Sequence, residues 1–396
     1  MLPSVLTLTD PAPPPAAAPA SLPPDAVGGR VAALNLFRAV VCLQIVAMHT
    51  YFGPVYGKLS ACLGPEADWL VSHLRFGYES FFVLAGYFLA HSFRPGRWSQ
   101  FSVPKFLKRR VIRLAVPYWI AAALGVAGLL ARERLTGAAS GVPSWSEVLP
   151  VFLFAHTLTD GWSPSTALWF MAVLIQLYVA WCLTFWLVRR WYLWSGREDF
   201  HGRAVAALQA LTAAAFVLSL WGYARGHVRP GTLAGSAVFV ALGCVTYWQA
   251  AQPRLRVLLL AGVAALTVAG LAAESSRLVA AAVTGVILPL LAGRTVPATA
   301  PARAVAAVGV MSYSIYLTHM YVAPRVLHLW SARGGAGSFP EVAGVYLLSI
   351  AAAVAFGYVF YRLVERPLAH ASRGVTYRVP AHHPEPAYAG GGRDTR

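Results

Sequence analysis

The chain has 396 residues, of which 58% are hydrophobic and 12% are charged, and its mean hydropathy is +0.58. Soluble domains carry about twice that charged fraction, so the composition excludes an ordinary soluble domain and indicates a polytopic membrane protein with a lipid bilayer as its partner. The net charge of +17 does not indicate nucleic acid, because the basic residues are spread unevenly, as the orientation of a membrane protein requires. The four cysteines form no CxxC pair, so we expect neither a metal site nor a disulfide framework.

Residues 1–29 are rich in proline and alanine and lack the basic and then apolar order of a signal peptide. We expect a disordered tail there, a transmembrane domain over 30–367 and a disordered cytoplasmic tail over 368–396. A spanning helix needs about 20 mostly apolar residues. The apolar stretches predict an all-α polytopic membrane protein with about ten transmembrane helices, near residues 33–52, 68–93, 112–131, 167–188, 204–223, 231–250, 255–273, 277–293, 304–325 and 342–363.

The longer connections are expected to be loops. Residues 53–67 are an outer loop, and part of 132–166 is apolar enough to dip into the membrane. An even number of spans places both termini on one side, and most of the 32 lysines and arginines fall on that side when the loops alternate. The positive-inside rule therefore predicts cytoplasmic termini, in a multi-pass protein of the cell (cytoplasmic) membrane.

The first span carries an ionisable residue near each end. Arg38 and His49 are separated by the apolar run 39–48. At about 100° per residue the two share a helix face, and they lie about 16 Å apart along the axis. Ionisable residues inside a membrane helix are costly and indicate function. The alternative is an interfacial arginine anchor and a hydrogen-bonded core histidine.

Four further side chains fall at the depth of His49 in this topology. Glu79 lies in the outer half of the second span, Trp169 and Gln176 lie in the fourth, and His319 lies in the ninth. If these spans are neighbours, their side chains line one cavity. The alternatives are an interfacial carboxylate for Glu79 and a core histidine with one hydrogen bond for His319.

Six short motifs follow one another along the chain. They are Leu34-Asn35-x-x-Arg38 with ten residues before His49, Glu79-Ser80-Phe81-Phe82-Val83-Leu84-Ala85-Gly86-Tyr87, Arg109-Arg110-x-x-Arg113-Leu114-x-x-Pro117-x-Trp119, Leu168-Trp169-Phe170-Met171 with Tyr178, Gly309-x-x-Ser312-Tyr313-Ser314-Ile315-Tyr316-Leu317-Thr318-His319, and Val364-Glu365-Arg366-Pro367. In this order they resemble the integral-membrane acyltransferase-3 family, whose members transfer acyl groups from acyl-coenzyme A to hydroxyls, mostly of sugars and glycans.

The chain departs from the family pattern in places. Asn35 and Ala39 stand where Asp and Gly are usual, and Ala85 stands where Ser is common. Leu174 and Ile175 replace an acidic pair that many members carry, which argues against a mechanism with a carboxylate on that helix. Some members add an extracytoplasmic esterase-like domain. The segment after residue 367 is short for one, so transfer is expected to finish in the membrane domain or with a separate extracytoplasmic glycan-modifying partner.

The resemblance implies roles for the candidate residues. Histidine suits a base whose pKa lies near operating pH, so His49 is expected to deprotonate the acceptor hydroxyl or to assist acyl loading. Glu79 is expected to orient or charge-balance His49 or Arg75, and Arg38 to hold a phosphate or the pantetheine amides. Trp169, Tyr316 and His319 are expected to line the substrate cavity. Glu365 and Arg366 are expected to cap the last helix and anchor it at the cytoplasmic face.

Three arginines stand at the start of the third span. Arg109, Arg110 and Arg113 fall on one helical patch, and arginine forks match phosphate oxygens. We expect them to bind acyl-CoA, although an ordinary positive-inside anchor is the alternative and is the interpretation for Lys105 and Lys108.

The prediction is a membrane O-acyltransferase that moves an acyl group, expected to be acetyl, from acyl-CoA to a hydroxyl of a sugar-containing acceptor. It uses acyl-CoA as co-substrate and needs no bound cofactor or metal. The alternatives are a transporter or flippase of a glycan or lipid-linked intermediate, and a noncatalytic partner of a polysaccharide system. No matched pair of Gly- or Pro-broken helices favours a transporter.

Overall fold

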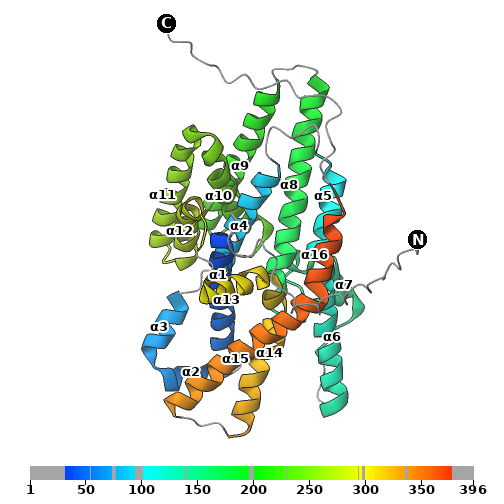
Figure 1. Ribbon diagram of the computed structural model, residues 1–396, viewed down its shortest axis with the longest axis vertical. Coiled ribbons are helices and arrows are strands. Elements are labelled where there is room, and N and C mark those ends of the chain that lie inside the picture. Colours follow the sequence, from blue (N-terminus) through cyan, green and yellow to red (C-terminus); the bar gives the residue numbers. More distant parts are fainter. Residues whose placement is uncertain are drawn as a thin grey trace, which may run out of the picture.

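The computed structural model shows an all-α protein, with no strand among the residues that it describes (Figure 1). It describes residues 32–53, 55–73, 77–93, 101–137, 139, 141–195, 200–229, 231–292, 294–296, 299–334 and 338–376. The α-helices are α1 (Ala32–Tyr51), α2 (Tyr56–Leu63), α3 (Pro65–His73), α4 (Gly77–Ser92), α5 (Val103–Arg110), α6 (Val116–Thr136), α7 (Trp145–Phe152), α8 (Leu168–Ser195), α9 (Phe200–Ala224), α10 (Leu233–Ala251), α11 (Arg256–Ala272), α12 (Ser276–Leu291), α13 (Ala300–Val310), α14 (Ser312–Ala332), α15 (Phe339–Phe360) and α16 (Arg366–Arg373).

Seven helical segments of the described chain are long and apolar enough to cross a membrane. They are Ala32–Tyr51, Val103–Thr136, Leu168–Tyr192, Gly202–Ala224, Leu233–Ala251, Pro253–Ala272 and Phe339–Arg373. The bent pair α13 and α14 makes an eighth if it is one span. The all-α, multi-pass prediction is therefore confirmed. The number ten stays a prediction, because α4 and α12 have only 16 residues each. The cytoplasmic location of the termini also stays a prediction.

Several boundaries differ from those expected. The segment 53–67 is not a plain loop, because it holds α2 and the start of α3. The ninth predicted span is not one helix, because α13 and α14 meet at Met311 with a bend of 75°. The tail 1–29 lies outside the described residues, as does 377–396, whereas 368–376 continues the last helix through α16.

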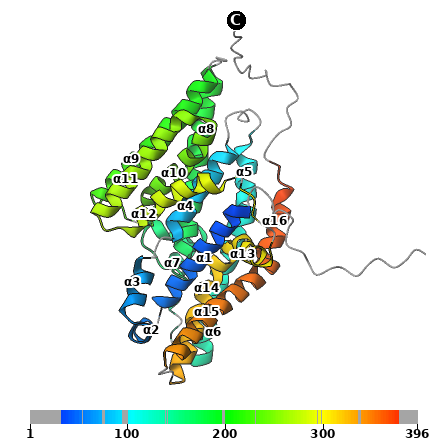
Figure 2. The same cartoon turned by 60° about the vertical axis from the view of Figure 1, so that its left-hand side comes forward.

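Helix α1 occupies the middle of the molecule. Figures 1 and 2 show α9 to α12 on one side of it and α13 to α16 on the other. Consistent with this position, α1 contacts α4, α12, α13, α14 and α15. The polar residues of α1 therefore lie between the two groups of helices, where side chains from several motifs can meet.

Glycines allow the central helices to approach closely. A Cβ on Gly243 of α10 would lie 1.9 Å from the carbonyl oxygen of Val83 on α4, and one on Gly86 of α4 would lie 2.0 Å from that of Val240. A Cβ on Gly309 of α13 would lie 1.8 Å from the Asn35 carbonyl oxygen of α1. Such backbone-to-backbone packing through small residues is typical of membrane helices, where no hydrophobic effect drives helix association.

Two short π-helical segments interrupt long helices. The first, η3 (Val111–Ala115), joins α5 to α6, and the second, η6 (Tyr361–Glu365), joins α15 to α16. The helix α16 packs against η3, so both wide turns lie in one region. Single π-helical turns are frequent at functional sites.

The apolar part of the loop 132–166 folds back between helices α6 and α8. The hydroxyl of Tyr118 donates to the Val151 carbonyl at 2.9 Å, and Trp119 Nε1 donates to the next carbonyl at 2.8 Å. From α8, Gln176 Nε2 donates to the Phe154 carbonyl at 2.5 Å. These bonds satisfy backbone groups that would be costly to bury in an apolar environment.

At the other end of α1, a carboxylate ties the short helices to the bundle. Tyr51 of α1 and Ser60 of α2 each donate a hydroxyl hydrogen bond of 2.5 Å to Asp68 of α3. These donors hold the pKa of the Asp68 carboxyl below its usual value of 3.8. The position of α3 thus depends on an ionised side chain.

The close approach of α4 and α10 predicts that Gly243→Ala destabilises the protein. The added methyl meets a backbone oxygen that cannot turn aside, so we expect a cost of about 1–3 kcal/mol and a lower midpoint of thermal unfolding in detergent. The control is Gly344→Ala on α15, where a Cβ meets nothing within 4 Å. Equal midpoints for the two variants would contradict this packing.

The Asp68 bonds predict a pH-dependent contribution to stability. Because the folded state lowers this pKa, the contribution is present at neutral pH and is lost as the pH falls through the folded-state value. We expect Asp68→Asn to lower the thermal midpoint at neutral pH and to match the wild type in acid. The exposed Glu66→Gln on the same helix is the control. A difference from the wild type that is the same at both pH values would argue against the charge.

Candidate functional site

Four arginines from α1 and from α5–η3 border one cavity of about 340 Å³. The cavity lies at the end of the bundle where α1 begins and α4 ends, which the predicted topology assigns to the cytoplasm. Its polar lining comprises Arg38, His91, Ser92, Arg109, Arg110, Arg113, Tyr178, Ser312, Tyr313 and Tyr316. Phe81, Phe88, Phe106 and Phe170 contribute apolar walls. A cationic mouth with aromatic walls suits a ligand that has an anionic end and a less polar arm.

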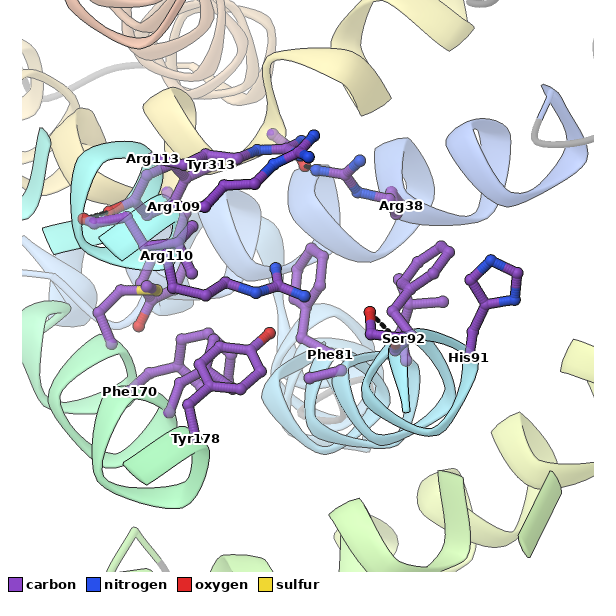
Figure 3. Close-up of a pocket in the computed structure, with 18 of the residues that line it drawn as sticks. Arg38, Phe81, His91, Ser92, Arg109, Arg110, Arg113, Phe170, Tyr178 and Tyr313 are labelled. Carbon is purple, nitrogen blue, oxygen red and sulfur yellow. Dashed lines mark hydrogen bonds between the residues drawn. The ribbon is translucent and has the colours of Figure 1, made fainter. Parts of the chain in front are cut away.

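The arginines of the third motif are brought together by a change of helix type. Arg109 and Arg110 end α5, and Arg113 lies in the π-helical turn of η3. Figure 3 shows the side chains of Arg109 and Arg113 extending toward Arg38, while Arg110 lies above Tyr178. The Arg110 guanidinium carbon is 4.8 Å from the Tyr178 ring centre, within the range of a cation–π interaction. The contact with the Tyr178 ring therefore restrains the Arg110 side chain, and all three arginines line the same cavity.

The start of α14 contacts the first of these arginines. Arg38 Nη2 donates to Ser312 Oγ at 3.0 Å, and the Cys42 thiol donates to the Ser312 carbonyl at 3.4 Å. Both contacts join the first span to the first residue after the bend at Met311. The bend thus places the N-terminus of α14 beside the guanidinium of Arg38, inside the bundle.

Glu365 has a different place from the one expected. It does not cap the last helix at a membrane face, because it is buried within η6 and accepts hydrogen bonds from Ser314 N at 3.2 Å and Ser314 Oγ at 2.5 Å. It therefore caps the first turn of α14. A buried carboxylate requires such partners, and the π-helical turn directs it to them.

The two histidines of the motifs contact each other directly. His49 Nδ1 and His319 Nε2 are 2.8 Å apart, and His319 Nδ1 is 2.7 Å from the Tyr316 carbonyl oxygen. The ring planes differ by 5° with centroids 5.1 Å apart, so the rings lie edge to edge around the hydrogen bond. His319 is fully buried, whereas His49 is partly exposed. The expected neighbourhood of the first and ninth spans is present at these residues.

Tyr316 links the histidines to the cavity. Its side chain lines the cavity, and its hydroxyl donates to the Ala167 carbonyl at 2.6 Å. Its own carbonyl holds His319. The histidine pair itself does not line the cavity, and Tyr316 is the residue that connects the pair to it.

Glu79 does not reach His49. Its carboxylate is fully buried, and its cationic neighbour among the described residues is Arg277 of α12, with 3.8 Å between Nε and Oε1. Gly77 at the start of α4 packs against Gln44 and Ile45 of α1, closer to the middle of that helix than His49. Arg75, the other expected partner, lies outside the described residues. The carboxylate is therefore part of a separate contact between α4 and α12.

Trp169 is also apart from the cavity. Its ring meets that of Tyr78 edge to face at 4.9 Å and packs beside Gly231. In contrast, His91 lines the cavity although none of the six motifs includes it. The available signal was its place at the end of the helix that carries the second motif.

In the part of the chain that the structure describes, no group of three or more His, Cys, Asp or Glu side chains is arranged to hold a metal ion. The charged groups that do converge are arginines, and a guanidinium is a hydrogen-bond donor without acceptor capacity. The cavity therefore fits the anionic end of an organic ligand, and phosphate is the group that arginine forks match best.

Comparison with known proteins agrees with the motifs. A family model described as an acyltransferase domain, that of the acyltransferase-3 family, matches residues 31–362. Comparison with curated proteins and with solved structures gave no significant match. The matched region includes the arginine-lined cavity, the histidine pair and all the spans that build them. The chain therefore belongs to the acyltransferase-3 family and is a membrane acyltransferase.

Proposed function

We propose that the protein transfers an acyl group, expected to be acetyl, from acyl-CoA to a hydroxyl of a sugar-containing acceptor. The observation that carries this proposal is the cavity that begins among four arginines and ends at Tyr316, whose carbonyl holds the histidine pair. An anion site and a base at the two ends of one path are the two requirements of acyl transfer from a phosphorylated thioester.

The donor end follows from the charges. Coenzyme A carries several phosphates, and the guanidiniums of Arg38, Arg109, Arg110 and Arg113 provide paired donors for them. The phenylalanine walls suit the longer and less polar pantetheine arm. In this arrangement the arm extends from the arginines past Phe170 toward Tyr316, and its thioester approaches the histidine pair.

The chemical step needs a base and returns one proton. His49 takes the proton of the acceptor hydroxyl as the oxygen attacks the thioester carbon. The new bond joins that oxygen to the acyl carbon, and the bond from carbon to sulfur breaks. The proton on His49 then passes to the coenzyme A thiolate, so free thiol and acyl ester are the products.

The acceptor is proposed to approach from the side opposite to the donor. His49 lies toward the far end of α1 from Arg38, is partly exposed and does not line the donor cavity, in which Tyr316 is the residue next to the histidine pair. With the predicted cytoplasmic termini, this far side is the outer face of the cell membrane. A separate extracytoplasmic glycan-modifying partner is compatible with this arrangement.

The base role predicts that His49→Ala abolishes acyl transfer. Loss of general-base catalysis typically costs a factor of 10² to 10⁴, so release of free coenzyme A from acetyl-CoA should fall at least about 100-fold. The measurement uses the purified protein with a crude glycan extract and a thiol reagent. The matched control is His328→Ala, an exposed histidine on α14, which should keep wild-type release.

Release that depends on both the extract and His49 supports the enzyme and allows the acceptor to be fractionated. Release that His49→Ala leaves unchanged contradicts the assigned base. A different result would identify a transporter. In that case the wild type binds coenzyme A but consumes no acyl-CoA of any chain length, and a labelled glycan crosses the membrane of vesicles that contain the protein.

The donor site predicts a selective effect of the arginines. Arg110→Gln and Arg113→Gln should each raise KM for acyl-CoA about tenfold or more, because a hydrogen bond to a charged group contributes about 1.5–3 kcal/mol. KM for the acceptor should change little. The control is Lys105→Gln, since Lys105 is exposed on α5 and does not line the cavity. A larger effect on the acceptor KM would move the arginines to the acceptor site.

A further inference from the structure

The two bonds of the histidine pair determine where the protons lie. The oxygen of the Tyr316 carbonyl is an acceptor only, so the nitrogen 2.7 Å from it, His319 Nδ1, carries the hydrogen. A neutral imidazole has one N–H, and the other nitrogen holds a lone pair. In neutral His319 that lone pair is on Nε2, which faces His49.

The same reasoning applies to the second ring. His49 Nδ1 is 2.8 Å from His319 Nε2, and a hydrogen bond between them requires one donor. Since His319 Nε2 is the acceptor, His49 Nδ1 carries the hydrogen. Neutral His49 is then left with its lone pair on Nε2, the nitrogen that the pair does not use.

We propose that His319 is a positioning residue, which holds His49 in the tautomer whose Nε2 is free to take a proton. This inference rests on the proposed function for its chemical meaning, because it names the atom that acts as base. Parallel ring planes and edge-to-edge contact fix the ring orientation as well as the tautomer. The role is comparable to that of a hydrogen-bonded partner that orients a catalytic or metal-binding imidazole.

The chain of bonds ends in a carbonyl, and this separates it from a triad that ends in a carboxylate. Among the described residues no carboxylate contacts either ring. A carbonyl accepts a hydrogen bond but does not take up the proton. After His49 has received the hydroxyl proton, the positive charge therefore stays on the two rings, which favours its prompt return to the leaving thiolate.

The direct test is ¹⁵N NMR of the full chain with labelled histidines, in lipid nanodiscs at mildly alkaline pH, where imidazole is neutral. The His49 signals are assigned by their loss in His49→Gln. We expect His49 Nδ1 to give the signal of a protonated nitrogen and His49 Nε2 that of a bare nitrogen. A proton on His49 Nε2 in the wild type overturns the proposal, whether or not acyl transfer has been detected.

Variants of His319 connect the tautomer to the rate. His319→Phe keeps an aromatic ring but removes the acceptor, so we expect a proton to appear on His49 Nε2 and coenzyme A release to fall about 100-fold with an unchanged KM for acyl-CoA. His319→Gln offers an amide oxygen near the Nε2 position and should recover part of both. His156→Phe is the control, since His156 is also buried but lies outside the site.

Each outcome is decisive for one of the two proposals. A wild-type rate in His319→Phe overturns the positioning role. The role is also overturned if His156→Phe slows coenzyme A release as much as His319→Phe does while the His49 signals of His156→Phe stay those of the wild type. If the wild type shows the expected ring protonation but consumes no acyl-CoA with any extract, the positioning contact stands and the proposed function fails.

Discussion

The break between α13 and α14 is the constraint on which the site depends. A helix that begins inside an apolar bundle exposes backbone N–H groups that water cannot reach. The Glu365 carboxylate supplies an acceptor for one of them, at Ser314. With this end stabilised, α14 presents Ser312 to Arg38, Tyr316 to the cavity and His319 to His49. Three of the six motifs thus meet because one helix ends early and another begins in the interior.

Much of this arrangement follows from the sequence alone. Apolar length and charge bias predicted an all-α membrane protein, and the spacing of Arg38 and His49 placed both on one helix face. The sequence also selected His319 and Tyr316. It did not reveal the bend at Met311, because no proline marks it and the nearby Gly309 is explained only by its contact with the Asn35 backbone. The partner of Glu79 was missed for a similar reason, since Arg277 stands on a helix almost 200 residues away and pairing at that distance depends on tertiary packing.

The proposed reaction divides the molecule at Tyr316. On one side lie arginines that attract phosphate, and on the other lies a histidine that is partly exposed. Such a division keeps the anionic part of the donor away from the acceptor while allowing the thioester to reach the base. Leu174 stands at one of the two positions where many members of the family carry an acid, and it lines this cavity, so the position adds no negative charge beside the arginines.

The π-helical turn of η6 has a consequence for the spacing of the chain. An α-helix advances by about 100° per residue, and a π-helical turn accommodates an additional residue without ending the helix. Deleting Arg362 or Leu363, which lie between Tyr361 and the sixth motif, would restore regular α-helical geometry and rotate Glu365 by about that angle relative to α15. The carboxylate would then face away from Ser314, although every side chain of the sixth motif would still be present. The rotational phase of this helix, and not the identity of its residues alone, is therefore a part of the site.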